Sequence, residues 1–231
     1  MENKSVAIHQ PNFMPWLGYF SKIKNADIFV FLDDIQFTKN SFTNRVKIAS
    51  QGKEQWITIP VINSGLEKTI MKTEIFNPDF NFQKILKTIH LNYKRTPFFD
   101  QTYSLIEPVL KKRQTQISEL NKELIVIISS ELKIKTKFLS SSQLKLTSNN
   151  FNASERLVNI CKILDCSIYM SGKGGFNYQD INLFEQNNLK IQPNDFKPLV
   201  YKQAHNGEFI SGLSILDALF NIGFEKTYNH L

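Results

Sequence analysis

The stretch Val6-Ala-Ile-His-Gln-Pro-Asn-Phe-Met-Pro-Trp-Leu-Gly-Tyr-Phe20 decides how this chain begins to fold. It opens with an apolar run, places His9 and Gln10 where that run ends, and then breaks into a loop at two prolines. A second run, Ala26-Asp-Ile-Phe-Val-Phe-Leu-Asp-Asp34, is too apolar for a strand with one solvated face and closes on two carboxylates. The pattern predicts a strand, loop, helix and strand, with polar residues at the strand ends where open α/β sheets bind ligands.

The next part of the chain predicts a β-hairpin followed by helices. Two β-like stretches, Trp56–Val61 and Thr69–Phe76, are joined by Asn63-Ser64-Gly65 and are expected to pair. Apolar residues then recur at helical spacing within residues 82–93, 103–112 (which contains Pro108) and 117–128. These helices are expected to cover a sheet face or to cap the site.

The second half of the chain again predicts strands and helices with polar residues at a strand end. Asn152 and Glu155 form a capping-box pattern before a helix with an apolar face. A short strand at 167–171, a helix at about 180–186 and a strand at 189–192 follow. The expected fold is α/β, a largely parallel sheet flanked by helices, with a β-hairpin and a helical insertion. The 231 residues are expected to form a single domain, with an internal linker near 140–151 in the polar Ser- and Asn-rich stretch.

Composition narrows the class of protein. The net charge of +7 is spread over solvated faces, and no helix-turn-helix, zinc finger or RNP-type strand is evident, so nucleic acid is not the expected partner. A modest positive field instead suits an anionic small molecule. No apolar run is long enough to span a bilayer, and no export signal precedes the first strand, so a cytoplasmic protein is expected. Cys161 and Cys166 lack the companions of a zinc site and are expected to be buried, reduced thiols, and no metal site is predicted.

His9 is the strongest candidate for acid–base chemistry. An imidazole titrates near neutrality and can take a proton from an attacking amine or hydroxyl. Gln10 is placed to hold a carbonyl or a sugar hydroxyl, and Trp16 and Tyr19 to stack on a base or sugar ring. The alternative is that His9 only satisfies backbone groups and the aromatic rings only fill the core.

Further candidates follow the second strand. Asp33 and Asp34 point to opposite sides, so one of them is expected to work at the site, by binding ribose hydroxyls, orienting His9 or holding a divalent ion through phosphates. The alternative role is a turn or helix cap. Asn44 and Arg45 are the other contributors expected from this half, since an arginine fork suits a diphosphate.

The loop after the strand at 167–171 is the predicted phosphate contact. Glycine backbones can approach an anion closely, and a lysine adds a point charge. The stretch matches neither the Walker A nor the Rossmann spacing, and a plain turn is the alternative. The strand ends after Ile8 and Met170 are expected on the same edge of one sheet. The predicted ligand contacts of this loop are Ser171, Gly172, Lys173, Gly174, Gly175 and Tyr178.

The same residues carry a family resemblance that covers almost the whole chain. It rests on His9-Gln10-Pro11, Pro15-Trp16, Gly18-Tyr19-Phe20, Lys22-Ile23, Ala26-Asp27, Phe29-Val30, Asp33-Asp34, Gln36-Phe37 and Asn44-Arg45, and farther along on residues 56–61, Tyr93, 169–178 and 213–223. In these motifs the chain resembles the WbqC-like protein family. Proteins of this kind are encoded among bacterial O-antigen, lipopolysaccharide and other surface-polysaccharide genes, and some members carry the label of glycine transferase.

Three functions follow as expectations. The resemblance implies a transferase of O-antigen biosynthesis that acylates, for instance glycylates, a nucleotide-linked amino sugar, with an acyl or aminoacyl donor of unknown identity. The family name assigns no residue roles, and the strand-end positions and side-chain chemistry predict His9, Gln10 and Asp33 as the catalytic residues. The strand-loop-helix opening is also similar to nucleotidylyltransferases, although the second histidine of their His-x-x-His element is missing. The third is a non-catalytic nucleotide-sugar binding protein of the same pathway. Neither the donor nor the oligomeric state follows from the sequence.

Overall fold

The structure, a computed structural model, describes residues 3–62, 68–112, 114–146, 151–172, 174, 179–198, 200–205 and 207–231. The chain folds into two compact units. The sheet unit comprises Met1–Gln10, Ser21–Asp33 and Ile134–Lys197. The helical unit comprises Pro11–Phe20, Asp34–Lys133 and Pro198–Leu231. Lys173, Gly175 and Tyr178, three of the predicted ligand contacts, lie outside the described residues.

The sheet unit contains the predicted parallel sheet. Its strands are β1 (Ser5–His9), β2 (Ile28–Phe31), β5 (Lys137–Ser140), β6 (Ile168–Ser171) and β7 (Lys190–Pro193), and their order is β5-β2-β1-β6-β7. Every neighbouring pair is parallel. In the centre, Ala7 of β1 pairs with Phe29 on one side and with Met170 on the other. The strand ends after Ile8 and Met170 therefore lie on the same edge, as the sequence predicts.

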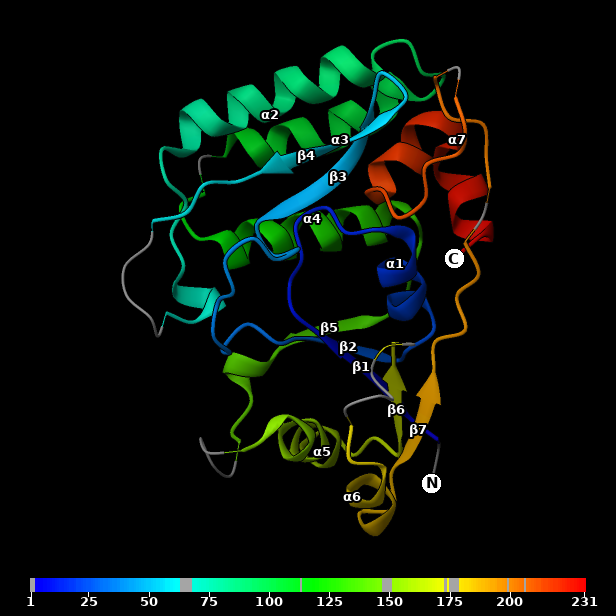
Figure 1. The fold of residues 1–231 in the computed structure, drawn as a ribbon. Helices are drawn as coiled ribbons and strands as arrows, with labels where there is room; N and C mark the ends of the chain where they lie inside the picture. Colours follow the sequence, from blue (N-terminus) through cyan, green and yellow to red (C-terminus); the bar gives the residue numbers. More distant parts are fainter. Residues whose placement is uncertain are drawn as a thin grey trace. The chain divides into compact units, whose positions relative to one another are not determined.

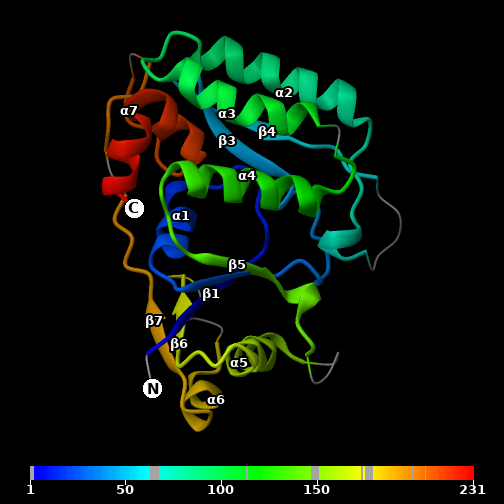
Figure 2. The same cartoon turned by 180° about the vertical axis from the view of Figure 1, so that it is seen from behind.

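Helices α5 (Ala153–Ile163) and α6 (Ile181–Gln186) cover one face of this sheet (Figures 1 and 2). Their apolar residues form one core with the strands, of which Val6, Val30, Val158 and Phe184 are members. α5 starts with the predicted capping box, in which Asn152 and Glu155 each accept a hydrogen bond from the other's backbone N–H. Cys161 and Cys166 are buried free thiols, and burial raises the pKa of Cys161 to about 12, so these side chains serve packing.

The hairpin of the helical unit lies earlier in the chain than predicted. It pairs β3 (Arg45–Ser50) with β4 (Lys53–Thr58) through a two-residue turn, Gln51-Gly52, in which both residues have positive φ, 50° and 75°. That geometry is the type I′ turn, whose twist matches the strands that it joins. The predicted pair between Trp56–Val61 and Thr69–Phe76 is wrong, because 69–76 contains the 3-10 helix η1 (Ile70–Lys72) and only an isolated bridge, Val61 to Ile75, joins the two stretches.

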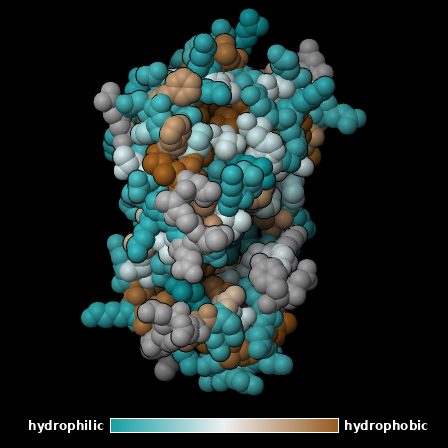
Figure 3. Space-filling view, turned by 60° about the vertical axis from the view of Figure 1, so that its left-hand side comes forward, coloured by the Kyte–Doolittle hydropathy of each residue, from teal (hydrophilic) through white to brown (hydrophobic). Residues whose placement is uncertain are grey.

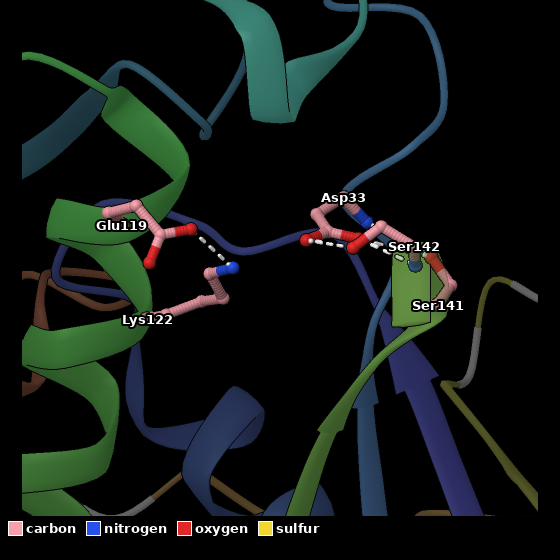
Figure 4. Close-up of polar contacts among 5 residues, drawn as sticks. All are labelled: Asp33, Glu119, Lys122, Ser141 and Ser142. Atoms are coloured by element: carbon pink, nitrogen blue, oxygen red, sulfur yellow. Dashed lines mark hydrogen bonds and ion pairs between the residues drawn. The ribbon is translucent and has the colours of Figure 1, made fainter. Parts of the chain in front are cut away.

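Longer helices follow the hairpin in the described part of the helical unit. α2 (Pro78–Tyr93), α3 (Phe99–Lys111) and α4 (Ile117–Glu131) confirm the predicted helices, and α7 (Ile215–Asn229) follows near the end of the chain. α3 packs against α2, α4 and α7. α4 carries an i,i+3 ion pair between Lys122 and Glu119 at 2.6 Å (Figure 4).

Helix α7 is interrupted at Gly223, where φ is 76°. A Cβ atom on this residue would lie 2.8 Å from the ring of Phe98, which precedes α3. Both the left-handed backbone and the close approach of the ring therefore require glycine at this position.

No helix in the described part of the chain has the length and apolar character needed to cross a bilayer. On the face drawn in Figure 3, apolar residues are interspersed among polar ones. Scattered exposure of this kind is normal for a protein surface in water and indicates no particular partner.

Candidate functional site

The topology of the sheet unit indicates where a ligand would bind. Counted in chain order within the sheet, the five strands read 3-2-1-4-5 across it. The chain runs from β1 to one side through β2 and β5, and then returns to the other side of β1 with β6 and β7. The order therefore reverses between β1 and β6. In open α/β sheets, the carboxyl ends of the strands at such a switch point form the usual ligand site.

His9 is the last residue of β1 and lies at this switch point. Its Nδ1 is 3.1 Å from the carbonyl oxygen of Gln10. Because a carbonyl only accepts hydrogen bonds, the neutral ring carries its proton on Nδ1, and Nε2 is then the basic nitrogen. Desolvation, together with the charge of Lys22, lowers the pKa of His9 from 6.5 to about 4, against a smaller raising effect of the Gln10 carbonyl. At neutral pH the imidazole is therefore uncharged and can accept a proton.

Lys22 is a candidate site residue that sequence reasoning missed. It lies on α1 (Leu17–Lys24), is only 5% exposed, and donates a hydrogen bond of 2.9 Å from Nζ to the carbonyl oxygen of Ile8. Its ammonium also lies 5.7 Å from the ring centre of Tyr169 on β6. Burial lowers the pKa of Lys22 from 10.5 to about 7. The signal was present in the helical spacing, which puts Lys22 on the same face as Tyr19 and Ile23, both buried.

The carboxyl end of β6 supplies the other side of the switch point. Ser171 is fully buried, and its hydroxyl lies 3.0 Å from Oε1 of Gln179 and 3.1 Å from the carbonyl oxygen of Gly172. The amide of Gln179 in turn donates to the hydroxyl of Tyr169 at 3.2 Å. Ser171 is thus part of a chain of hydrogen bonds that holds the end of β6, and its predicted contact with a ligand stays a prediction.

Gly172 and Gly174 can be approached closely, but their backbones need no glycine. Neither has a φ in the left-handed region, and a Cβ atom built on either would meet no described atom within 4 Å apart from its chain neighbours. The absence of a described neighbour at these two residues is compatible with a ligand contact, and equally with a plain loop. Their role in phosphate binding therefore stays a prediction.

Asp33 and Asp34 follow β2 and differ as the alternation of a strand predicts. Asp33 is 1% exposed, whereas Asp34 is half-buried. The carboxylate of Asp33 accepts hydrogen bonds from the Ser142 backbone N–H at 3.1 Å, the Ser142 hydroxyl at 3.0 Å and the Ser141 hydroxyl at 3.3 Å (Figure 4). These two serines begin the 3-10 helix η2 (Ser141–Gln143), so Asp33 caps the turn that follows β5.

The predicted aromatic contacts belong to the helical unit. Trp16 is 43% exposed, and its indole ring covers the backbone of Gly18, where a Cβ atom would lie 2.4 Å from the ring. Gly18 therefore makes room for this indole. Tyr19 is 3% exposed and packs edge-on against Phe20, with ring centres 6.1 Å apart. Trp16 is thus partly exposed and Tyr19 is part of the core, and the contact of either ring with a ligand stays a prediction.

Arg45 and Asn44 also belong to the helical unit. The guanidinium of Arg45 lies 4.3 Å from the ring centre of Trp56, and Lys47 lies 5.3 Å from the same ring. Asn44 is buried and donates to the carbonyl oxygen of Ile59 at 3.1 Å. Asn44 thus holds the chain after β4, while Arg45 presents a cation on an aromatic ring that is itself 39% exposed. Their contact with a ligand stays a prediction.

A second buried polar cluster lies in the helical unit, around Asp217 of α7. Its carboxyl group is fully buried and accepts hydrogen bonds from the Tyr93 hydroxyl at 3.0 Å, the Tyr201 hydroxyl at 2.7 Å and the Gln203 amide at 2.8 Å. Burial raises the pKa of Asp217, and these three donors partly offset the effect. The Tyr93 hydroxyl also accepts from the backbone N–H of Ala49 on β3. The cluster ties α2, α7 and β3 together.

Within the described residues, no group of three or more His, Cys, Asp or Glu side chains is placed to hold a metal ion.

Comparison with known proteins identifies the family of the chain. The family model of the WbqC-like protein family matches residues 10–229. The chain is also 33% identical over 225 residues to the uncharacterized protein Rv1507c of Mycobacterium tuberculosis, covering 96% of this chain and 95% of that protein. No solved structure matches significantly. With this coverage, the chain belongs to the WbqC-like protein family.

Proposed function

We propose that the protein is a transferase of surface-polysaccharide biosynthesis, which moves an acyl group, such as glycyl, onto the amino group of a nucleotide-linked sugar at the β1/β6 switch point. The observation that carries this proposal is the position of His9. A neutral imidazole ends the central strand β1 beside a buried lysine, at the place in the sheet where ligands usually bind. The family resemblance supplies the class of substrate.

His9 acts as the general base in this proposal. The sugar amine attacks the acyl carbonyl carbon of the activated donor, and a C–N bond forms while the amine proton passes to Nε2 of His9. The bond from the carbonyl carbon to the donor's leaving group then breaks, and the leaving group takes that proton. Because Nδ1 is held by the Gln10 carbonyl, Nε2 is the nitrogen that exchanges the proton.

The low pKa of His9 is compatible with this role once a ligand is present. A pKa of about 4 describes the site without a ligand, where desolvation and the Lys22 charge both oppose protonation. A nucleotide diphosphate brings negative charge, which favours the protonated imidazole and raises its pKa toward neutrality. The Gln10 side-chain amide is a suitable donor for the oxyanion that develops on the carbonyl.

The test of this proposal is a transfer assay with the purified protein. UDP-, dTDP- and GDP-linked amino sugars are incubated with glycine and ATP or with preformed glycyl donors, and mass spectrometry detects the acylated nucleotide sugar. His9→Gln is expected to lower turnover by roughly a hundredfold or more while leaving nucleotide-sugar affinity nearly unchanged. Full activity of the variant would remove His9 from the chemistry. Absence of acylated product with every donor would contradict the proposed transfer.

The strand order also supports a second function, nucleotidyl transfer. The 3-2-1-4-5 order is the arrangement of mononucleotide-binding sheets, and His9 follows the first strand of that order. The two reactions differ in what they consume and release. Acyl transfer requires an acyl donor, whereas nucleotidyl transfer to a sugar phosphate consumes a nucleoside triphosphate and releases pyrophosphate. Binding of nucleotide sugars without turnover in either assay would leave a binding protein of the same pathway.

A further inference from the structure

Lys22 places an amino group inside the sheet unit, and no carboxylate of the described residues forms an ion pair with it. Its side chain is only 5% exposed, and within the described part of the chain its single hydrogen-bond acceptor is the carbonyl oxygen of Ile8. The ring of Tyr169 adds a weaker contact at 5.7 Å. An ammonium group has three N–H donors, so this environment satisfies only part of its capacity.

The direction of the Ile8 carbonyl places the ammonium at the switch point. Successive carbonyls of a strand point to opposite sides. The His9 carbonyl accepts from the backbone N–H of Leu32, just after β2, so it points to the β2 side. The Ile8 carbonyl therefore points to the β6 side, and Lys22 Nζ, 2.9 Å from it, lies between the carboxyl ends of β1 and β6. This position also explains its contact with Tyr169, a β6 residue.

A buried, protonated lysine destabilises the folded protein unless other contacts replace its lost hydration. A buried ammonium loses several kcal/mol of hydration, and one carbonyl and one aromatic ring replace only part of it. A methionine or leucine would fill the same space at no such cost. A lysine in this place is therefore best explained by an anion that binds there and completes its coordination.

We propose that Lys22 is the cation that binds a phosphate group of the ligand at the β1/β6 switch point, an inference that rests on the nucleotide-linked substrate of the proposed function. It assigns the phosphate contact to a residue of α1, which belongs neither to the glycine loop nor to the hairpin. It also connects binding with chemistry. The bound phosphate neutralises the charge that Lys22 exerts on His9, and so makes the imidazole a stronger base.

The first experiment measures UDP binding by calorimetry for the wild type and two variants. Lys22→Met keeps the length of the side chain and removes the ammonium. Lys24→Met, in the last turn of the same helix, changes the net charge equally and is the matched control. UDP is expected to bind about 10- to 100-fold more weakly to Lys22→Met and within about twofold of the wild type to Lys24→Met. Equal UDP affinity of wild type and Lys22→Met would overturn the inference.

A second measurement uses the wild type and so does not depend on the folding of a variant. At pH 8.5 the phosphates of UDP are fully deprotonated, and Lys22 without a ligand is largely neutral. Its neighbours there are the ring of Tyr169 from β6 and His9 from β1, whose pKa of about 4 lies far below this pH. Binding of UDP is expected to take up about one proton, measured by calorimetry in buffers of different ionisation enthalpy. Binding without proton uptake would overturn the inference.

The two proposals fail in different ways. If UDP binding depends on Lys22 but no acyl transfer occurs, the anion site stands and the proposed reaction is wrong. If transfer occurs and UDP binding is indifferent to Lys22→Met, the reaction stands and Lys22 is a structural anchor. If neither UDP nor inorganic pyrophosphate binds the wild type, the phosphate site is wrong.

Discussion

Lys22 in the sheet unit and Asp217 in the helical unit are both buried ionisable side chains on apolar helix faces, yet their surroundings differ. Asp217 receives three hydrogen bonds from Tyr93, Tyr201 and Gln203. Lys22 has one hydrogen-bond partner, the Ile8 carbonyl, among the described residues. A buried group whose hydrogen-bonding capacity is filled by the protein serves the fold. In our proposal, a ligand fills the capacity that the protein leaves open at Lys22, so the contrast is between a structural cluster and a candidate site.

The largest expected effect is at Asp217. Asp217→Ala removes the common acceptor and leaves two tyrosine hydroxyls and an amide without their partner. We expect a loss of about 3 to 5 kcal/mol in the free energy of unfolding, measured with urea. Glu225→Ala on the exposed side of the same helix is the control and is expected to change stability by less than about 0.5 kcal/mol. If Asp217→Ala also lowered the free energy of unfolding by less than about 0.5 kcal/mol, the Asp217 cluster would not be a structural one, and its contrast with Lys22 would be wrong.

Replacing Lys22 is expected to raise the free energy of unfolding, whereas replacing Asp217 lowers it. Its pKa of about 7 lies below the 10.5 of a lysine in an unfolded chain, so between these pH values the unfolded chain binds more protons and stability rises with pH. The cost of burying Lys22 is therefore complete below pH 7 and disappears as the pH approaches 10.5. Lys22→Met is expected to stabilise the protein by roughly 1 to 4 kcal/mol at pH 6. The gain should shrink toward pH 10, followed by urea unfolding at both pH values.

A destabilised Lys22→Met variant at pH 6 would show instead that the hydrogen bond to Ile8 anchors α1 to β1. In that case Lys22 would resemble Asp217, and the comparison would fail.

The smallest effects compare two tyrosine hydroxyls, one from each unit. The hydroxyl of Tyr201 donates to the Asp217 carboxyl at 2.7 Å, whereas that of Tyr169 accepts from the neutral Gln179 amide at 3.2 Å. Tyr201→Phe is expected to cost about 1.5 to 3 kcal/mol and Tyr169→Phe about 0.5 to 1.5 kcal/mol, because hydrogen bonds to charged groups contribute more. Thermal unfolding of both variants measures the difference. The reverse order would mean that the β6 end is the more tightly coupled network.

The sequence predicts elements whose signals are local. The apolar period of α2 and α4, the Asn152–Glu155 capping box and the parallel strands β1, β2 and β6 all follow from neighbouring residues. The hairpin is misplaced because its turn, Gln51-Gly52, lacks the usual Asn-Gly or Asp-Gly signal, although the alternation of Arg45–Ser50 is that of a strand. The sequence does not predict β5 (Lys137–Ser140), because this strand has only four residues and contains no apolar run long enough to stand out after the alternating lysines before it.

The candidate site is predictable only in part. His9 stands out because it ends an apolar strand, and this local feature survives in the structure. The capping of η2 by Asp33 depends on a contact across 109 residues of chain, and the position of Lys22 beside Tyr169 on a contact across an even longer separation. Such long-range contacts leave no mark in the local sequence. They decide which polar residues the fold uses for itself and which it leaves for a ligand.

The central place of β1 has a consequence for the synthesis of the protein. On one side β1 pairs with β2, and only helix α1 separates these two strands in the sequence. On the other side β1 pairs with β6, where Ser5 lies opposite Ile168. A ribosome therefore completes the hydrogen bonding of β1 only after helices α2 to α5 have been made. Until then one side of an apolar strand stays open to pairing with other chains. The sheet that carries the candidate site is therefore begun before helices α2 to α4 of the helical unit and completed after them.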